Sequence, residues 1–165
     1  MCFSLLRDRN SRSGVGTQTS NPRDRRRTEI VRTELTFIGR IETPYKKLED
    51  CPRNIDPNGP LCRLVLEDPY QEGLLGLEPG REILILYWLE HADRTRLRQN
   101  PAHIGKLTGT FALRSPHRPN PIGAALVKIE TFSGNTLTVR GLDCLDGTPL
   151  IDIKPAMKPE IGRQV

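Results

Sequence analysis

The most unusual stretch of the sequence is Arg114–Gly123, RSPHRPNPIG, where three prolines fall within six residues. Each proline fixes its own φ angle and restricts the residue before it, so we expect a stiff, extended loop with few backbone donors and many free carbonyls. Such a loop can hold a ligand at little entropic cost. A rigid connection between strands, with its arginines in solvent, explains the composition equally well. Four side chains would project from the loop in fixed directions: those of Arg114, His117, Arg118 and Asn120.

A second polar stretch, Leu142–Pro155, reads LDCLDGTPLIDIKP. Its Asp146-Gly147 pair is typical of a tight turn, which would let a carboxylate and backbone amides face a polar ligand. Asp143, Asp146 and Asp152 supply three carboxylates. No cluster of His or Cys ligands accompanies them, so we expect no metal site. A plain turn that leads into a strand is the competing interpretation.

Two shorter segments also carry groups that can do chemistry. Tyr87–Asp93, YWLEHAD, ends a very apolar run, and Glu90 and His91 there could bind a ligand hydroxyl or move a proton at the rim of a pocket. Cys51–Asn54, CPRN, contains Arg53, which could pair with a carboxylate or phosphate. A single histidine is more often structural or solvated, and Arg53 taken alone is a weak signal.

The elements that must position these groups are short β-like runs, punctuated by Gly, Pro and Asp. Ile83–Glu90 is apolar throughout, which suits a strand buried on both faces. Ser133-Gly134-Asn135 lies between two runs and predicts a hairpin. The seven runs are Leu35–Glu42, Leu61–Glu67, Ile83–Glu90, Gly109–Arg114, Ile122–Thr131, Thr136–Arg140 and Thr148–Lys154.

Helical signals are few. Pro69–Leu77 could form one or two turns, and Asp93–Gln99 could form a short polar helix capped by Asp93. Seven short strands with little helix predict a mainly β fold, an antiparallel barrel or sandwich. The sequence lacks βαβ alternation, a G-x-G-x-x-G motif after a strand and a P-loop motif, so a Rossmann sheet and the common phosphate-binding sites are disfavoured.

Charge divides the chain into two parts. Residues 1–33 contain eight arginines and three acidic residues, so the whole formal net charge of +5 lies there. We predict a disordered, Arg-rich tail over 1–33 and one β domain over 34–165. The tail could attract RNA, DNA or anionic lipid, or have no role at all. The four cysteines show no metal-site spacing, and no signal peptide or membrane span is evident, so we expect a cytoplasmic protein with reduced thiols.

Two motifs together resemble those of a known family. FALRSPHRPNPIG, followed by LDCLDGTPLIDIKP, is similar to the signature of the TsaA-like (TrmO) family, and FIGRIETPYK and CPRN resemble that family's first strand and loop. The resemblance covers about residues 35–159. It implies a compact antiparallel β-barrel of a non-Rossmann methyltransferase type. It also implies a homodimer that binds S-adenosyl-L-methionine near the subunit interface and N6-methylates a threonylcarbamoyl-modified adenosine beside the anticodon of certain tRNAs.

The resemblance also assigns positions in this sequence. The implied substrate contacts are Arg118 and Asn120. The family's cofactor contacts would fall on Pro52, Arg53, Asn54, Glu90, His91, Arg114, Leu126, Asp146, Gly147, Thr148 and Pro149.

Methyl transfer to N6 needs a group that helps to remove the N6 proton, because the lone pair of that nitrogen is delocalised. The candidates are His91, Asn120 and Asp146, in no firm order, and the catalytic residue is not assigned. Two other readings stay open: a methyltransferase of the same fold with another acceptor, and a non-catalytic module that binds S-adenosylmethionine or RNA.

Overall fold

The computed structural model describes residues 33–157. The predicted tail over 1–33 therefore lies outside the described residues apart from Thr33, as do the last eight residues of the predicted domain. From Leu35 onward the described residues form one compact unit.

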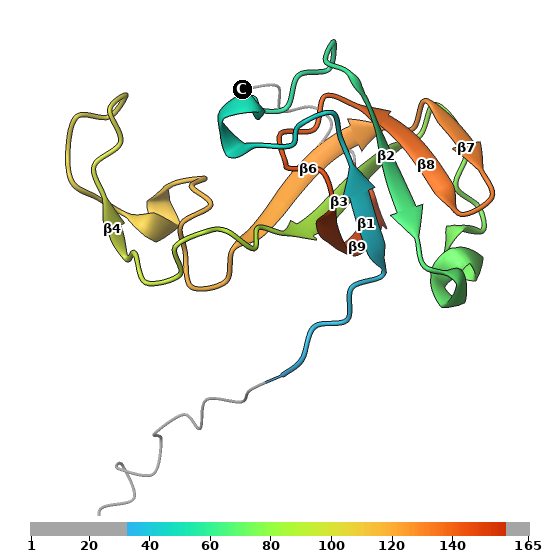
Figure 1. The fold of residues 1–165 in the computed structure, drawn as a ribbon, viewed down its shortest axis with the longest axis horizontal. Helices are drawn as coiled ribbons and strands as arrows, with labels where there is room; N and C mark the ends of the chain where they lie inside the picture. Colours follow the sequence, from blue (N-terminus) through green and yellow to red (C-terminus); the bar gives the residue numbers. More distant parts are fainter. Residues whose placement is uncertain (1–32, 158–165) are drawn as a thin grey trace, which may run out of the picture. The chain divides into compact units, whose positions relative to one another are not determined.

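All pairs in the main sheet are antiparallel, and the strand order is β6-β3-β9-β1-β2-β8-β7 (Figure 1). The predicted mainly β, antiparallel fold class is confirmed. The strands of this sheet are β1 (Gly39–Glu42), β2 (Leu61–Leu66), β3 (Glu82–Trp88), β6 (Ile122–Lys128), β7 (Thr131–Ser133), β8 (Thr136–Arg140) and β9 (Thr148–Pro155). The remaining elements are β4 (Arg98–Gln99), β5 (Thr108–Gly109) and the 3-10 helices η2 (Leu48–Asp50), η3 (Asp68–Leu74) and η4 (Thr110–Ala112).

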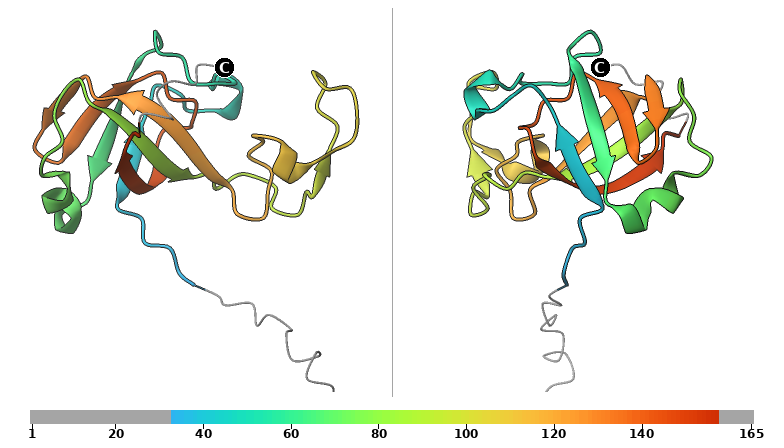
Figure 2. Two further views of the ribbon diagram at one scale, coloured as in Figure 1. Left: turned by 180° about the vertical axis from the view of Figure 1, so that it is seen from behind. Right: turned by 45° about the vertical axis from the view of Figure 1, so that its right-hand side comes forward.

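The sheet curves around one hydrophobic core without closing into a barrel, since β6 and β7 stand at its two ends (Figure 2). Between β6 and β7, the Glu130 N–H donates to the carbonyl of Thr138 in β8 at 2.8 Å. Alternate residues of β2, β3, β6 and β8 point into the core, as the period of two in a half-buried strand requires. The side chains of Ile41, Leu64, Ile83, Ile85, Leu137, Val139 and Leu150 are fully buried there.

The structure corrects one burial prediction. The apolar run that begins at Ile83 was expected to be buried on both faces, but β3 alternates between fully buried and half-buried residues. Ile83, Ile85 and Tyr87 face the core, while Leu84 and Leu86 are only half covered. The reason is the all-antiparallel sheet, which encloses its core on one face and leaves the other face without a covering layer of helices.

Two secondary-structure predictions between β3 and β6 are wrong. Asp93–Gln99 is not a helix. The Asp93 carboxylate does accept the Thr95 N–H at 2.9 Å, as a cap would, but the chain then extends to pair β4 with β5. In the run Gly109–Arg114 only Gly109 belongs to a strand, the end of β5, because the hydroxyl of the buried Thr110 donates to the Arg96 carbonyl and the backbone turns there into η4.

Other local predictions hold. The expected turns within Pro69–Leu77 appear as η3. The hairpin at Ser133–Asn135 joins β7 to β8, and Gly134 adopts the positive φ of +60° that such a turn needs.

Residues 90–120 form an excursion between β3 and β6 that extends from the end of these two strands (Figures 1 and 2). The excursion is closed at its base, where the Leu89 N–H donates to the Pro121 carbonyl at 2.9 Å. Its interior is polar: Gln99 donates to the Thr110 hydroxyl and the His117 carbonyl, both at 3.0 Å, and accepts from Ser115 at 2.7 Å. Its large apolar side chains point outward instead, with Phe111 80% exposed and Leu107 63% exposed.

Candidate functional site

Tyr87 lies near the end of β3 and faces the start of β6, where the proline-rich stretch leads into that strand. It pairs with Gly123 across the two strands. A Cβ atom on Gly123 would lie 2.2 Å from Cε2 of the tyrosine ring, so the ring occupies the space that any other residue at 123 would fill. The glycine of the RPNPIG motif is therefore required by the packing of a buried aromatic ring, which is only 3% exposed.

The Tyr87 hydroxyl donates to a carboxylate oxygen of Asp143 at 2.8 Å. Burial, the negative charge of Asp143 and this hydrogen bond together raise the pKa of Tyr87 well above its ordinary value, and the positive charge of Arg114 opposes the rise. Tyr87 therefore keeps its proton at any physiological pH and remains a donor to Asp143. Asp143 itself is only half-buried.

Residues from three of the sequence-derived segments interact electrostatically with Asp143 or with its partner Tyr87. Arg114, which opens the proline-rich stretch, is close enough to oppose the rise in the pKa of Tyr87, and its guanidinium also donates to the Ala124 carbonyl. Cys51, which opens the CPRN loop, has its thiol pKa raised by burial and then by the charge of Asp143. The same two causes raise the pKa of Cys144 to about 12. The proline-rich stretch, the CPRN loop and the 142–149 turn therefore each place one residue within electrostatic reach of Tyr87 or Asp143.

The CPRN loop is anchored to the chain just before Asp143. The Asp56 N–H donates to the Gly141 carbonyl, and the Gly141 N–H donates to the Pro60 carbonyl, both at 2.9 Å. Gly141 has a φ of +69°, and a Cβ atom there would lie 1.5 Å from the Asp56 carbonyl oxygen. Within this anchored loop Pro52 is half-buried, and Arg53 and Asn54 are exposed.

Asp146 belongs to a different local network from Asp143. Its carboxylate accepts the Thr43 N–H at 3.0 Å and forms an ion pair of 2.5 Å with Lys46. The hydrogen bond from Lys46 lowers the pKa of Asp146, with the Thr43 N–H in support and burial in opposition. In the same turn, the Gly147 N–H donates to the Ile41 carbonyl. The Asp146-Gly147 turn therefore packs against β1 and the residues that follow it.

Thr148 and Pro149 follow Gly147 at the start of β9. Thr148 is buried and its hydroxyl donates to the Leu145 carbonyl at 2.7 Å. Pro149 is half-buried and pairs with Arg40 of β1. Leu126, in the middle of β6, is half-buried and pairs with Leu84 of β3.

The remaining sequence-derived residues lie in the excursion. Glu90, His91 and Asn120 are exposed. Arg118 has a structural role, because its guanidinium donates to the Ser115 carbonyl at 2.8 Å and also to the Leu113 carbonyl. The free carbonyls expected of the proline-rich stretch are thus partly satisfied from within the same stretch.

The sequence alone marks Asp143 only as one of three carboxylates, and it indicates no role for Tyr87. Tyr87 carries one usable signal, since it falls on the inward register of an apolar strand together with Ile83 and Ile85. A buried tyrosine needs a partner for its hydroxyl. The identity of that partner depends on pairing between distant strands, which one sequence does not reveal.

The three aspartates of the 142–155 segment do not converge. Asp143 accepts from Tyr87, Asp146 pairs with Lys46, and Asp152 pairs with Lys154 at 2.5 Å. Within residues 33–157, no group of three His, Cys, Asp or Glu side chains is arranged to hold a metal ion. The same residues contain no helix that is both long and apolar enough to cross a membrane.

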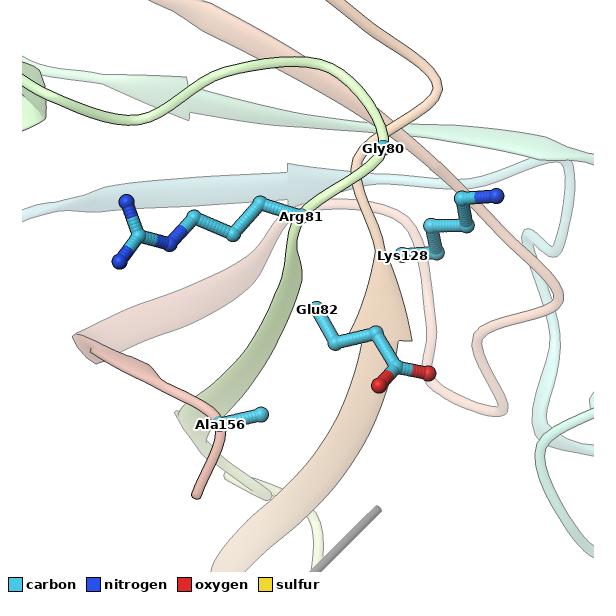
Figure 3. Close-up of a pocket in the computed structure, with 5 residues that line it drawn as sticks. All are labelled: Gly80, Arg81, Glu82, Lys128 and Ala156. Atoms are coloured by element: carbon cyan, nitrogen blue, oxygen red, sulfur yellow. The ribbon is translucent and has the colours of Figure 1, made fainter. Parts of the chain in front are cut away.

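Two surface depressions are lined in part by charged residues. One is lined by Arg40, Glu42, Lys46, Arg63 and Asp146 among others, and its cations are already paired: Arg40 and Arg63 with Glu42, and Lys46 with Asp146. The other, shown in Figure 3, lies at the opposite end of β3 from Tyr87. There the side chains of Arg81 and Lys128 point away from each other. Neither depression presents converging unpaired groups to a ligand.

Comparisons with known proteins agree with these motifs. Residues 40–159 match the sequence model of a family described as the tRNA-methyltransferase O N-terminal domain. The chain is 50% identical over 121 residues to the "Probable S-adenosyl-L-methionine-binding protein VirR" of Rhizobium radiobacter, an alignment that covers 73% of this chain and 69% of that protein.

Two further matches involve larger proteins. The chain is 41% identical over 88 residues to the tRNA (adenine(37)-N6)-methyltransferase of Mus musculus, covering 52% of this chain and 20% of that protein. The crystal structure of TrmO from Pseudomonas aeruginosa matches with a TM-score of 0.67 and 29% sequence identity, covering 82% of this chain and 61% of that one. The chain therefore spans less than two thirds of both of these proteins.

Proposed function

Because this chain belongs to the family of the tRNA-methyltransferase O N-terminal domain, whose model matches residues 40–159, we propose that it is a methyltransferase that uses S-adenosyl-L-methionine to methylate tRNA. The observation that supports the proposal is that Cys51, Arg114 and Asp143, one residue from each of the three motif segments, lie within electrostatic reach of Asp143 or its partner Tyr87. These are the segments from which the family resemblance draws its cofactor contacts.

The charges of these segments suit S-adenosylmethionine, which carries a sulfonium, an amino group and a carboxylate. Arg114 and Arg53 offer guanidinium groups to the carboxylate of the cofactor. The residues proposed to hold the cofactor are Pro52, Arg53, Asn54, Glu90, His91, Arg114, Leu126, Asp146, Gly147, Thr148 and Pro149. Arg118 and Asn120 are proposed to act on the substrate side.

The bound cofactor would supply an electrophilic methyl group on a positively charged sulfur. The chain's own contribution is positioning, because in-line transfer requires the nucleophile and the methyl carbon to be held about 3–3.5 Å apart. The packing of Tyr87 on Gly123 and the anchoring of the CPRN loop by Gly141 both limit local movement around Asp143. A site made from such interlocked segments is suited to hold two reactants in one fixed geometry.

The proposal also specifies the atom that accepts the methyl group. We propose N6 of a threonylcarbamoyl-modified adenosine next to the anticodon, and therefore a protein that works with tRNA in the cytoplasm. The relative from Mus musculus bears the name of an adenine(37)-N6-methyltransferase, which supports this choice of atom.

A homodimer is part of the proposal. The excursion over residues 90–120 has a polar interior and exposes large apolar side chains, including Leu97 at 60% and Phe111 at 80%. It also contains six Arg or Lys and two acidic residues, whereas residues 34–165 are formally neutral. Burial of the apolar side chains and attraction to the acidic remainder of a second copy would both favour pairing.

A second candidate function is S-adenosylmethionine binding with a different methyl acceptor or with none. The name of the relative from Rhizobium radiobacter, which includes only cofactor binding, favours it.

Transfer of a labelled methyl group to bulk tRNA separates the candidates. The purified protein is incubated with methyl-labelled S-adenosylmethionine and tRNA from a strain that lacks the gene, and the nucleosides are then analysed by mass. We expect label in an N6-methylated, threonylcarbamoyl-modified adenosine that is absent from the mutant tRNA. Cofactor binding by calorimetry without transfer to any RNA, together with an unaltered nucleoside profile in the mutant, would refute the proposed function.

A further inference from the structure

The three proton acceptors suggested by the sequence are poorly suited to that task. Asp146 is paired with Lys46 and the Thr43 N–H, and these contacts lower its pKa. A carboxylate stabilised in this way is a weaker base. Asn120 has an amide, which is not a base, and His91 is exposed, with no hydrogen bond to any residue between 33 and 157 that would orient its ring.

Asp143 has the features that these residues lack. One carboxylate oxygen, Oδ1, is held by the Tyr87 hydroxyl at 2.8 Å. The tyrosine is fixed in turn by its packing on Gly123. Asp143 remains half-buried, so the carboxylate is oriented without being enclosed. The charged or titratable groups around it are Arg114, Cys51 and its neighbour Cys144, besides Tyr87.

We propose that Asp143 is the catalytic residue that accepts the proton of the methylated nitrogen, and that Tyr87 is the residue that positions it. This inference rests on the proposed function and adds a residue to the same site. As the nitrogen–carbon bond forms, the carbon–sulfur bond breaks and its electron pair stays on sulfur, which becomes a neutral thioether. The proton of the nitrogen passes to Asp143, which becomes a neutral carboxylic acid.

The separate roles of the two residues follow from their chemistry. Tyr87 retains its proton, so it acts only as a hydrogen-bond donor. Its hydrogen bond to Oδ1 fixes the orientation of the Asp143 carboxylate and leaves Oδ2 to receive a proton.

The test compares three variants of the full chain with the wild type: Asp143→Asn, Tyr87→Phe and, as a matched control, Asp152→Asn on β9. Folding is first checked by circular dichroism and thermal unfolding. Calorimetry then gives the affinity for S-adenosylmethionine, and single-turnover reactions give the rate of methyl transfer to tRNA. We expect Asp143→Asn to lower that rate by about 100-fold or more, the typical contribution of a general base, with cofactor affinity changed less than threefold. Asp152→Asn should leave both quantities unchanged.

Tyr87→Phe tests the positioning role, because it removes only the hydroxyl that holds Oδ1 of Asp143. We expect kcat to fall by about tenfold, as for the loss of one hydrogen bond to a charged group, with KM unchanged. The affinity for S-adenosylmethionine should also be unchanged. The inference would be overturned if the wild type transfers methyl groups and Asp143→Asn does so at an undiminished rate. Loss of cofactor binding in Asp143→Asn would overturn it too. So would a Tyr87→Phe variant with the kcat of the wild type. In each case the proposed function would stand, whereas a wild type inactive on every RNA would refute both.

Discussion

The aromatic ring of Tyr87 occupies the place of a side chain on Gly123, with only 2.2 Å between its Cε2 atom and the position of a Cβ atom on the glycine. This relationship joins the end of the proline-rich stretch to the hydrogen bond between Tyr87 and Asp143. It also explains why the motif RPNPIG ends in glycine although the backbone there is an ordinary strand.

Replacement of Gly123 with alanine should displace the ring and break the hydrogen bond to Asp143. We expect a loss of about 1–3 kcal/mol in the free energy of unfolding, the usual cost of overpacking a core, together with a large loss of methyl transfer. Urea denaturation and the labelled-methyl assay measure the two effects. Gly109→Ala is the matched control, since a Cβ atom there meets nothing within 4 Å. Equal destabilisation by both variants would contradict the role given to the ring.

A second glycine pair tests the anchoring of the CPRN loop. Gly134 and Gly141 have similar positive φ angles, +60° and +69°, but only at Gly141 would a Cβ atom collide, 1.5 Å from the Asp56 carbonyl oxygen. Gly134→Ala should cost about 1 kcal/mol, which reflects the backbone conformation alone. Gly141→Ala adds a clash and should cost about 3 kcal/mol or more. It should also weaken binding of S-adenosylmethionine, as calorimetry would show, and similar costs for the two variants would be inconsistent with the anchor.

The ion pair between Asp146 and Lys46 predicts a pH-dependent contribution to stability. Because the pKa of Asp146 is lowered in the folded protein, the contribution is present above the ordinary value of 3.8 and is lost as the pH falls through the lower folded value. Asp146→Asn should therefore destabilise the protein at neutral pH, by less than about 1 kcal/mol because Lys46 is exposed. The difference from the wild type in chemical denaturation should disappear in strong acid. A difference that grows as the pH falls would have the wrong sign.

The exposed apolar side chains of the excursion predict a surface mutation that changes assembly. Replacing Phe111 and Leu107 with serine should convert a dimer into a monomer, as measured by sedimentation, with little change in the fold of each subunit. Leu75→Ser is the control, because Leu75 is 95% exposed but lies outside the excursion, directly after η3. A wild type that sediments as a monomer would refute the dimer.

The arginines before residue 34 predict an electrostatic contribution to RNA binding. Removal of residues 1–33 takes away the entire formal net charge of +5. The tRNA affinity of the truncated protein should fall at low salt and depend less steeply on salt, because fewer counterions are released on binding. Filter binding at several salt concentrations gives both quantities, and an unchanged affinity at low salt would show that the tail has no such role.

The sequence predicts the fold well where the hydrophobic pattern is regular. Six of the seven expected runs contain a strand of the main sheet, and Ser133–Asn135 marks its hairpin correctly. The failures lie between β3 and β6, where polar side chains decide the local structure. Asp93 carries a cap signal, but its segment extends to pair with β5, and Thr110 turns a β-like run into η4 through a bond to the Arg96 carbonyl.

The candidate site is likewise only partly predictable from the sequence. The motif segments can be found from their unusual composition, because three prolines or an Asp-Gly turn stand out in any sequence. The choice among neighbouring carboxylates cannot be made that way. Asp143 and Asp146 are three residues apart, yet one accepts from Tyr87 and the other pairs with Lys46. That difference arises from the pairing of strands that are distant in the sequence.

The structure of the chain in complex with S-adenosylmethionine would test the central claim most directly. We predict that the cofactor contacts Arg114, the loop that follows Cys51 and the 142–149 turn. A cofactor bound instead beside Arg81 and Lys128, at the opposite end of β3, would contradict this prediction.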